Sequence, residues 1–205
     1  MREARAPLLE RDLDPDPISQ FSKWMGEVRD AELVEPTAMT LATSTKDGRP
    51  SARTVLLKGV DDRGFVFFTN YESRKGRELT ENPHAALVFW WGALERQVCV
   101  TGSVARVSAA ESDAYFNSRP AQSRIGALAS RQSSVLASRE DLDRRVAELT
   151  GQYKFGGIPR PAYWGGFRLT PETIEFWQGR ANRLHDRLRY NRQRDGNWTV
   201  DRLSP

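Results

Sequence analysis

The sequence predicts an α+β protein that is mainly β, an antiparallel barrel decorated with helices. Strand-forming segments are joined by tight turns, and the turn sequences Lys46-Asp47-Gly48 and Asp61-Asp62-Arg63-Gly64 follow each other closely. Helical segments are inserted between groups of strands and do not alternate with them, which excludes a doubly wound parallel sheet. Six Trp, nine Phe and five Tyr supply bulk for a core, although the hydrophobic share is only 39%.

The first half of the chain contains an arm, a helix and a run of strands. Residues 1–16 are charged and interrupted by proline, so we expect a flexible N-terminal arm. Asp16 and Pro17 begin a helix as its N-cap and first residue, because apolar residues then recur at three- and four-residue spacing. The two turns predict an antiparallel meander of strands at 38–43, 53–58 and 65–69.

The second half is expected to complete a single domain that covers residues 17–205. Ser73 caps a short helix at 74–81, and two strands follow at 85–91 and 97–107. Residues 108–153 are patterned as helix, with a break at Ser118-Arg119-Pro120. The last strands are expected at 166–169, 174–177, 183–190 and 198–203.

Composition excludes several classes of protein. The net charge of +4, from 31 Lys and Arg against 27 Asp and Glu, is too small to require a nucleic-acid partner. No apolar stretch is long enough to span a membrane, and the first residues do not resemble a signal peptide, so we expect a cytoplasmic protein. One cysteine, Cys99, and two histidines cannot form an internal disulfide or a usual zinc site. The common nucleotide-binding glycine motifs and the hydrolase Gly-x-Ser-x-Gly motif are absent.

The segment Arg183-Leu184-His185-Asp186-Arg187 concentrates positive charge near the end of the chain. If residues 183–190 form a strand, alternate residues from Arg183 to Arg189 share one basic face. A solvated edge that protects the strand from aggregation and a site for an anionic ligand explain this face equally well. His185 and Asp186 cannot pair as a catalytic dyad there, because neighbours on a strand point to opposite faces.

Two further basic clusters are candidate anion sites. The first cluster combines two residues of an expected strand with two residues in the first turn of the Ser73-capped helix: Arg53, Lys58, Arg74 and Lys75. The free backbone N–H groups at the start of that helix also attract anions. The other has four-residue spacing across the Pro120 break: Tyr115, Arg119 and Ser123. Ordinary exposed charges and an exposed helix face are the simpler explanations when each cluster is taken alone.

Nine short motifs follow one another in a specific order. They are Pro36-Thr37-Ala38-Met39, Arg53-Thr54-Val55-Leu56-Leu57-Lys58, Thr69-Asn70 with Ser73-Arg74-Lys75, Glu95-Arg96-Gln97-Val98, Ser118-Arg119-Pro120, Gln132-Ser133-Ser134, Trp164-Gly165-Gly166-Phe167, Glu175-Phe176-Trp177-Gln178-Gly179 and Arg183-Leu184-His185-Asp186-Arg187. Each motif alone is a weak signal, but the ordered series is specific. From about Asp14 to Pro205, the chain resembles the pyridoxamine (pyridoxine) 5′-phosphate oxidase family.

The resemblance implies an FMN-binding split barrel of antiparallel strands with flanking helices. It also implies a homodimer with one FMN per active site at the subunit interface. The expected reaction oxidises pyridoxamine or pyridoxine 5′-phosphate to pyridoxal 5′-phosphate, with O₂ reduced to H₂O₂ and ammonia released from the amine. No metal, nucleic-acid or membrane partner is expected.

The resemblance also assigns roles to individual residues. It implies that FMN contacts Arg53, Thr54, Val55, Leu56, Leu57, Lys58, Phe68, Thr69, Arg74, Lys75, Gln97, Gln132, Ser133, Trp177 and Arg187, with its phosphate at Arg74 and Lys75. It implies that the substrate phosphate contacts Lys58, Tyr115, Arg119 and Ser123. Arg183, Leu184 and His185 are expected over the reacting face of the substrate, where Arg183 and His185 are the catalytic candidates that position and polarise it. Two basic sites suit this chemistry, because cofactor and substrate each carry a phosphate.

Two departures and two rival functions stay open at this point. Phe68 stands where the family often has Tyr, and Arg2-Glu3-Ala4-Arg5 lacks the Tyr of a family segment that covers the substrate. The nearest rival is a related FMN-dependent oxidase of phenazine biosynthesis. The other is a flavin-binding or nucleic-acid-binding module without turnover, which the excess of arginine suggests.

Overall fold

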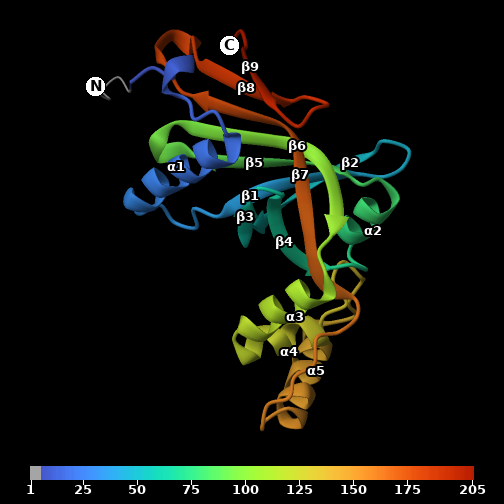
Figure 1. Ribbon diagram of the computed structural model, residues 1–205. Helices are drawn as coiled ribbons and strands as arrows, with labels where there is room; N and C mark the ends of the chain where they lie inside the picture. The colour runs from blue at the N-terminus through green and yellow to red at the C-terminus, as the bar shows by residue number, and fades with distance from the viewer. Residues whose placement is uncertain (1–5) are drawn as a thin grey trace.

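The computed structural model describes residues 6–205, whose strands form one nine-stranded antiparallel sheet (Figure 1). Hydrogen-bonded neighbours follow the order β2-β1-β5-β6-β7-β4-β3, and β8 and β9 extend from β7. The curled sheet with its helices confirms the predicted α+β class and split-barrel architecture. The strands are β1 (Ala38–Ser44), β2 (Pro50–Leu56), β3 (Gly59–Asp61), β4 (Gly64–Asn70), β5 (His84–Trp91), β6 (Arg96–Arg106), β7 (Trp164–Gln178), β8 (Asp186–Arg192) and β9 (Trp198–Arg202).

The sheet forks along β7, its longest strand. One edge of β7 pairs with β6, whereas the other edge pairs with β4 over residues 164–169 and with β8 over residues 173–178. The register of β6 shifts between Thr101 and Gly102, where a Cβ on Gly102 would lie 2.0 Å from the carbonyl oxygen of Thr170. The fork separates the end of the sheet that carries β4 from the end that carries β8 and β9 (Figure 1).

Helix α1 (Pro17–Asp30) covers the barrel core. It begins as predicted, because the Asp16 carboxylate accepts the N–H of Ser19 at 2.9 Å and Pro17 is the first residue. Its fully buried Phe21 ring packs with centroids 5.0 Å from both Phe65 and Phe89. These aromatic contacts fill the barrel, as the composition predicted.

The remaining helices lie near the β4 end. Helix α2 (Arg74–Glu81) begins where Ser73 accepts the N–H of Gly76, as predicted. The region expected to be helical with a break contains three helices, α3 (Ala109–Ser118), α4 (Ala121–Ala129) and α5 (Arg139–Gln152). They project beyond the sheet in Figure 1 and have a small core of their own, which includes Phe116, Ile125, Ile158 and Trp164.

The predicted meander is wrong beyond its first hairpin. Strand β2 pairs with β1, but the β3–β4 hairpin joins the sheet through β7. Strand β4 is buried at almost every position, so it needs a place inside the sheet, whereas β2 alternates exposed and half-buried residues as an edge strand does.

The predicted strand at 183–190 is also wrong at its start. Strand β8 begins at Asp186, and a short 3₁₀ turn, η3 (Ala181–Arg183), precedes it. Asn182 and Arg183 have φ angles of 57° and 61°, in the left-handed region, which no β-strand can accommodate. Arg183 therefore lies in a loop before the strand, and the continuous basic face shortens to the part within β8.

The described part of the predicted arm, residues 6–16, lies against β8 and β9. Leu8 is buried, and the carbonyl oxygen of Asp14 accepts the Tyr190 hydroxyl at 2.6 Å. A 3₁₀ turn, η1 (Glu10–Asp12), lies between them. Residues 1–5, which include the Arg2-Glu3-Ala4-Arg5 segment, lie outside the described residues. Within residues 6–205, no helix combines the length and apolar character needed to cross a membrane.

Candidate active site

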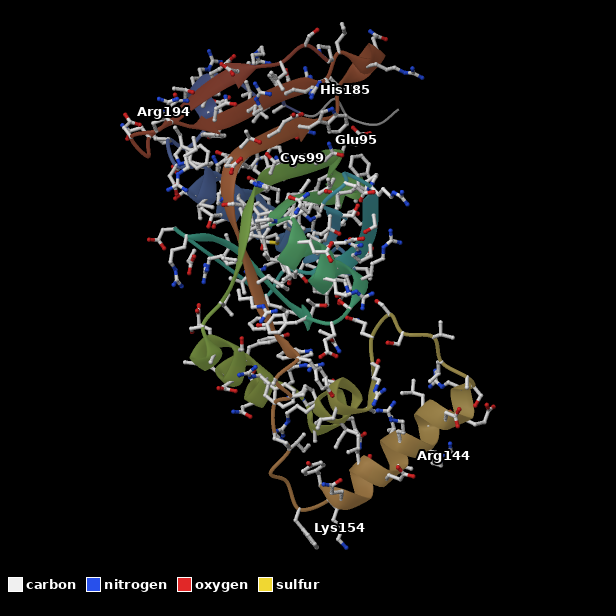
Figure 2. All side chains as sticks on the ribbon, turned by 90° about the vertical axis from the view of Figure 1, so that its right-hand side faces the viewer. Glu95, Cys99, Arg144, Lys154, His185 and Arg194 are labelled. Carbon is white, nitrogen blue, oxygen red and sulfur yellow. The ribbon has the colours of Figure 1, made fainter. Side chains whose placement is uncertain are left out.

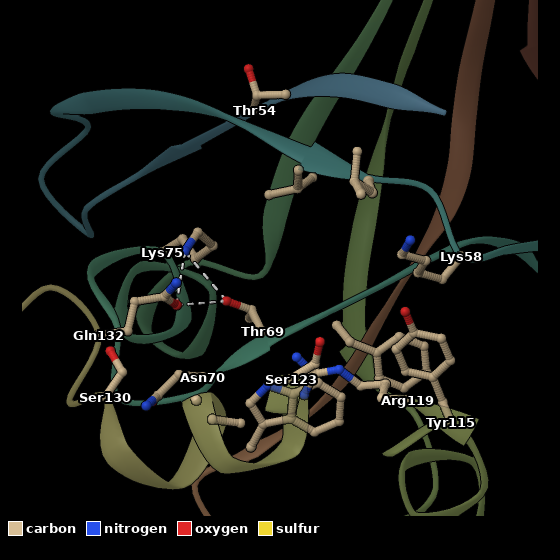
Figure 3. Close-up of a pocket in the computed structure, with 16 residues that line it drawn as sticks. Thr54, Lys58, Thr69, Asn70, Lys75, Tyr115, Arg119, Ser123, Ser130 and Gln132 are labelled. Atoms are coloured by element: carbon tan, nitrogen blue, oxygen red, sulfur yellow. Dashed lines mark hydrogen bonds between the residues drawn. The ribbon is translucent and has the colours of Figure 1, made fainter. Parts of the chain in front are cut away.

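A pocket of about 460 Å³ opens between the β4 end of the sheet and the helices (Figure 3). Its walls come from β2, β4, the first turn of α2, and helices α3 and α4. Eleven of the predicted site residues line it: Thr54, Val55, Leu56, Lys58, Phe68, Thr69, Lys75, Tyr115, Arg119, Ser123 and Gln132. The pocket therefore brings together residues assigned to FMN and residues assigned to the substrate phosphate.

One end of the pocket contains a buried ammonium group. Lys75 is 7% exposed, and its Nζ donates to Thr69 Oγ1 at 3.3 Å and to Gln132 Oε1 at 3.2 Å. Burial lowers the pKa of Lys75, the charge of Arg53 lowers it further, and the carboxylate of Glu78 opposes both. Within residues 6–205 Lys75 forms no ion pair, so this end of the pocket suits an anion.

The buried carboxylate of Glu78 forms ion pairs with two further cations near the pocket. Its side chain is 4% exposed and contacts Arg53 at 3.3 Å and Arg74 at 2.9 Å. Ser51 donates to it at 2.5 Å, and Thr43 also donates to it. Burial alone would raise the pKa of Glu78, but these hydrogen bonds and the charge of Arg53 lower it to about 2. Arg53 and Arg74 are thus held beside the pocket, where they do not line it.

The depressed pKa of Glu78 predicts a specific dependence of stability on pH. Because the folded pKa is lower than the unfolded value of 4.5, the stabilisation is complete above that value and is lost as the pH falls towards about 2. We expect Glu78→Gln to lower the free energy of unfolding by about 2 kcal/mol near neutral pH and by progressively less below pH 4.5. Urea titrations at fixed protein concentration measure this difference, with Glu172→Gln as an exposed control. A difference that stays constant down to pH 3 would contradict the linkage.

The other end of the pocket is aromatic and contains a partly desolvated guanidinium. The rings of Phe68 and Tyr115 stack with centroids 3.9 Å apart, and Phe68 also stacks on Trp164 at 5.6 Å. The guanidinium of Arg119 lies 4.8 Å from the Trp164 ring, and its buried Nη1 has no hydrogen-bond partner within residues 6–205. Burial lowers the pKa of Arg119, with a smaller opposing effect from Tyr115. An unsatisfied buried donor of this kind is suited to an anionic ligand.

Six predicted residues lie at the end of the sheet that carries β8, away from β4: Gln97, Trp177, Arg183, Leu184, His185 and Arg187. Figure 2 shows His185 far from Arg144 of α5 and from Lys154, which follows that helix. These residues form a cluster of their own. Gln97 is the register partner of Trp177, whose ring centroid lies 4.5 Å from that of His185. Arg187 pairs with Glu175 at 2.8 Å. Within a single chain, therefore, these six residues do not line the pocket.

The remaining predicted residues lie near the pocket but do not line it. Leu57 is buried in the barrel core. Ser133 follows Gln132 with a φ of 71°. The pocket also includes five residues that were not assigned to it: Asn70, Gly126, Ala127, Ser130 and Trp164. Sequence signals existed for them, because Trp164 begins one of the nine motifs and Ala127 continues the four-residue spacing from Ser123 along α4.

The forked antiparallel barrel and its pocket, with a buried or half-buried cation towards each end, define a split-barrel protein suited to anionic ligands. Residues 25–153 match the family model described as pyridoxamine 5′-phosphate oxidase. Residues 164–205 match the pyridoxine 5′-phosphate oxidase C-terminal dimerisation region. The chain belongs to the pyridoxamine 5′-phosphate oxidase family.

Curated relatives are similar to the chain over nearly its whole length. The pyridoxine/pyridoxamine 5′-phosphate oxidase of Nostoc sp. is 60% identical over 198 residues, which cover 97% of this chain and 92% of the relative. The enzyme of the same name from Rubrobacter xylanophilus is 60% identical over 201 residues, with 98% and 92% covered.

Solved structures confirm the fold. PhzG from Burkholderia lata 383, in complex with tetrahydrophenazine-1-carboxylic acid, superposes with a TM-score of 0.92 at 35% identity and covers 98% of this chain and 100% of its own. A pyridoxamine 5′-phosphate oxidase-related, FMN binding protein from Nostoc punctiforme has a TM-score of 0.74 at 17% identity, covering 94% and 100%. The second likeness concerns the fold alone.

Proposed function

We propose that the protein is an FMN-dependent oxidase that converts pyridoxamine or pyridoxine 5′-phosphate to pyridoxal 5′-phosphate. The observation that carries this proposal is the pair of cations, Lys75 and Arg119, in one pocket. Neither forms an ion pair with a carboxylate within the described chain. A buried ammonium and a half-buried guanidinium along one pocket suit two phosphate groups, one from the cofactor and one from the substrate. The names of relatives at 60% identity support the same activity.

The cofactor part of the site fits FMN. Lys75 holds the FMN phosphate, with Arg53 and Arg74 adding positive charge from behind it. The half-buried Val55 and Leu56 of β2 offer an apolar wall to the flavin ring. When bound, FMN supplies the two-electron acceptor for the reaction, and O₂ takes up those electrons to form H₂O₂.

The substrate part of the site lies around Arg119. Its guanidinium, with Lys58, Tyr115 and Ser123, binds the substrate phosphate and so orients the pyridine ring beside the flavin. Oxidation removes a hydride equivalent from the hydroxymethyl or aminomethyl carbon and a proton from its oxygen or nitrogen. The alcohol gives the aldehyde directly, whereas the amine gives an imine whose hydrolysis releases ammonia.

His185 acts in this proposal as a hydrogen-bond donor. Its Nδ1 accepts the backbone N–H of Arg180 at 3.1 Å, so in the neutral ring the proton is on Nε2. Nε2–H can donate to an oxygen or nitrogen of the substrate, and Arg183 supplies a nearby positive charge. Both groups position and polarise the substrate, and neither needs to accept a proton.

The proposed active unit is a homodimer, in which the partner subunit supplies the β8 cluster. The matched dimerisation region, residues 164–205, contains Trp177, Arg183, His185 and Arg187. These four residues do not line the pocket, and His185 lies far from the helical end of the molecule (Figure 2), so a second copy is the simplest source of them for each pocket. Each dimer then has two equivalent sites.

A hybrid dimer tests this arrangement. Arg119→Ala and Arg183→Ala should each abolish most substrate turnover while FMN stays bound. A purified heterodimer of the two variants should regain about half of wild-type activity, because one of its sites receives intact Arg119 and Arg183 from different chains. The test is steady-state oxidase activity of doubly tagged heterodimers. Activity no higher than that of the single variants would place both residues of a site in the same chain.

The decisive test of the activity is an oxidase assay. The purified protein should take up FMN, turn yellow and consume O₂ with pyridoxine 5′-phosphate while pyridoxal 5′-phosphate appears. Failure to take up FMN would refute the proposed function, whereas FMN binding without turnover would leave only a flavin-binding module. Oxidation of a phenazine precursor, with neither vitamin B6 phosphate used, would favour the PhzG-like alternative, whose solved relative shares 35% identity.

We also propose that the protein works in the cytoplasm. Its single cysteine, Cys99, leaves no internal disulfide to require an oxidising compartment.

A further inference from the structure

The loop that carries Arg183 and His185 is closed at its base by Asp186. Gln178 and Asp186 are register partners in β7 and β8, so residues 179–185 form a loop between them. Asp186 Oδ2 lies 3.5 Å from Nε of Arg180, at the other side of the loop. The backbone N–H of Arg180 in turn donates to His185 Nδ1. The carboxylate is only 16% exposed, so its contacts are formed away from bulk solvent.

Asp186 is also tied to both ends of the chain. Its Oδ2 accepts the N–H of Leu8 at 3.1 Å, and its Oδ1 accepts Nη1 of Arg202 at 2.9 Å. Arg202 uses its remaining donors on the N-terminal segment: Nε and Nη2 form a fork on the Glu10 carboxylate at 2.7 and 2.9 Å, and Nη2 also donates to the Leu8 carbonyl oxygen. We call the contacts among Leu8, Glu10, Asp186 and Arg202 the terminal clamp.

The loop needs such support because its conformation is intrinsically unfavourable. Asn182 and Arg183 both lie in the left-handed region, and Arg183 and Leu184 are exposed. Left-handed conformations of residues other than glycine persist only where surrounding contacts hold them. Two side-chain contacts hold the loop: His185 Nδ1 accepts the backbone N–H of Arg180, and the Arg180 guanidinium pairs with Asp186.

We propose that Asp186 is a positioning residue and that the terminal clamp sets substrate affinity by holding the Arg183–His185 loop in its binding conformation. The clamp contacts the loop through Asp186, and Glu10 lies on a separate segment of the chain. This inference rests on the proposed function, because it takes Arg183 and His185 as substrate-contacting groups. It assigns a role to the N-terminal segment that does not require the segment to cover the active site.

Glu10→Gln is the test variant, since it keeps the size of the side chain and removes the charge that holds Arg202. We expect KM for pyridoxine 5′-phosphate to rise about threefold, the scale of a lost exposed ion pair, with kcat and FMN occupancy close to wild type. Asp143→Asn, which breaks the exposed Arg139–Asp143 pair on α5, is the matched control and should leave KM unchanged. Asp186→Asn should raise KM further than Glu10→Gln, because it weakens the contacts to Arg180 and Arg202 together.

Hydrogen exchange of the FMN-loaded enzyme gives a second, activity-independent readout. Peptides that span residues 179–186 should exchange faster in Glu10→Gln than in wild type, and Asp143→Asn should match wild type. Unchanged exchange and unchanged KM in Glu10→Gln would overturn the proposal, as would a loss of FMN with no change in KM. If wild type oxidises no vitamin B6 phosphate, the proposed function fails, but the exchange experiment still decides whether the clamp holds the loop.

Discussion

Replacing Arg119 with alanine is expected to raise KM for pyridoxine 5′-phosphate by about a hundredfold while the protein retains FMN. The side chain stands over Trp164 with a buried Nη1 that has no partner within residues 6–205. In the proposed complex this donor meets the substrate phosphate, and charge-assisted hydrogen bonds of a fork to phosphate are among the strongest in proteins. Steady-state kinetics, together with the visible absorbance of bound flavin, measure both parts of the prediction.

The same substitution should not destabilise the ligand-free protein, and this separates a binding role from a structural one. Burial lowers the pKa of Arg119, so the folded chain bears a desolvation cost that alanine removes. We expect an unchanged or higher midpoint of thermal unfolding without ligand. Arg119→Lys, which keeps the charge but not the planar fork, should give an intermediate KM. A large drop in thermal stability with an unchanged KM would show that Arg119 serves the fold.

The second large effect is expected at the cofactor end. Lys75→Met should weaken FMN binding by about tenfold to a hundredfold, the value of one charge-assisted hydrogen bond to phosphate. Lys75 is 7% exposed, and within residues 6–205 its ammonium contacts the neutral side-chain oxygens of Thr69 and Gln132. Methionine fills a similar volume without the charge, so the apoprotein should remain folded. Titration of apoprotein with FMN, followed by flavin fluorescence, gives the affinity.

Lys154→Met is the control for this experiment, because Lys154 lies just beyond the C-terminus of α5 (Figure 2) and does not line the pocket. It should bind FMN as wild type does. Since burial lowers the pKa of Lys75, the apoprotein's affinity for FMN should also begin to fall at a more acidic pH than the ordinary lysine pKa of 10.5 would suggest. Full FMN affinity in Lys75→Met would remove Lys75 from the phosphate site and leave Arg53 and Arg74 as its candidates.

The local elements were predictable because the residues that begin and end them are adjacent in the sequence. Asp16 with Pro17 and Ser73 with Gly76 form caps within one turn of helix, and no distant contact is needed to recognise them. The same holds for the Asp47-Gly48 hairpin between β1 and β2. The predicted grouping of Tyr115, Arg119 and Ser123 is also confirmed despite the break at Pro120. All three residues, from α3, the connection and α4, line the same pocket.

The strand order was not predictable in the same way. The two successive turns favoured a meander, but β4 pairs with β7, about a hundred residues later in the chain. Which strand a buried segment joins depends on the apolar faces that the rest of the chain presents, and no turn sequence encodes that. The position of Arg183 was missed for a related reason: the loop with left-handed Asn182 and Arg183 is anchored to Asp186, which in turn contacts the distant residues Leu8 and Arg202.

The sequence by itself determined the α+β class, the helix caps, the tight turns and, through its ordered motifs, the family and the residues to inspect. Only the tertiary structure decided how the segment Arg183-Leu184-His185-Asp186-Arg187 is divided: a left-handed loop, a clamped Asp186 and the first residues of β8. It also decided that Lys75 and Arg119 share one pocket while His185 lies at the other end of the chain. The physical reason is that short-range patterns specify backbone conformation and the spacing of side chains, whereas burial and pairing depend on segments that meet only when the whole chain folds.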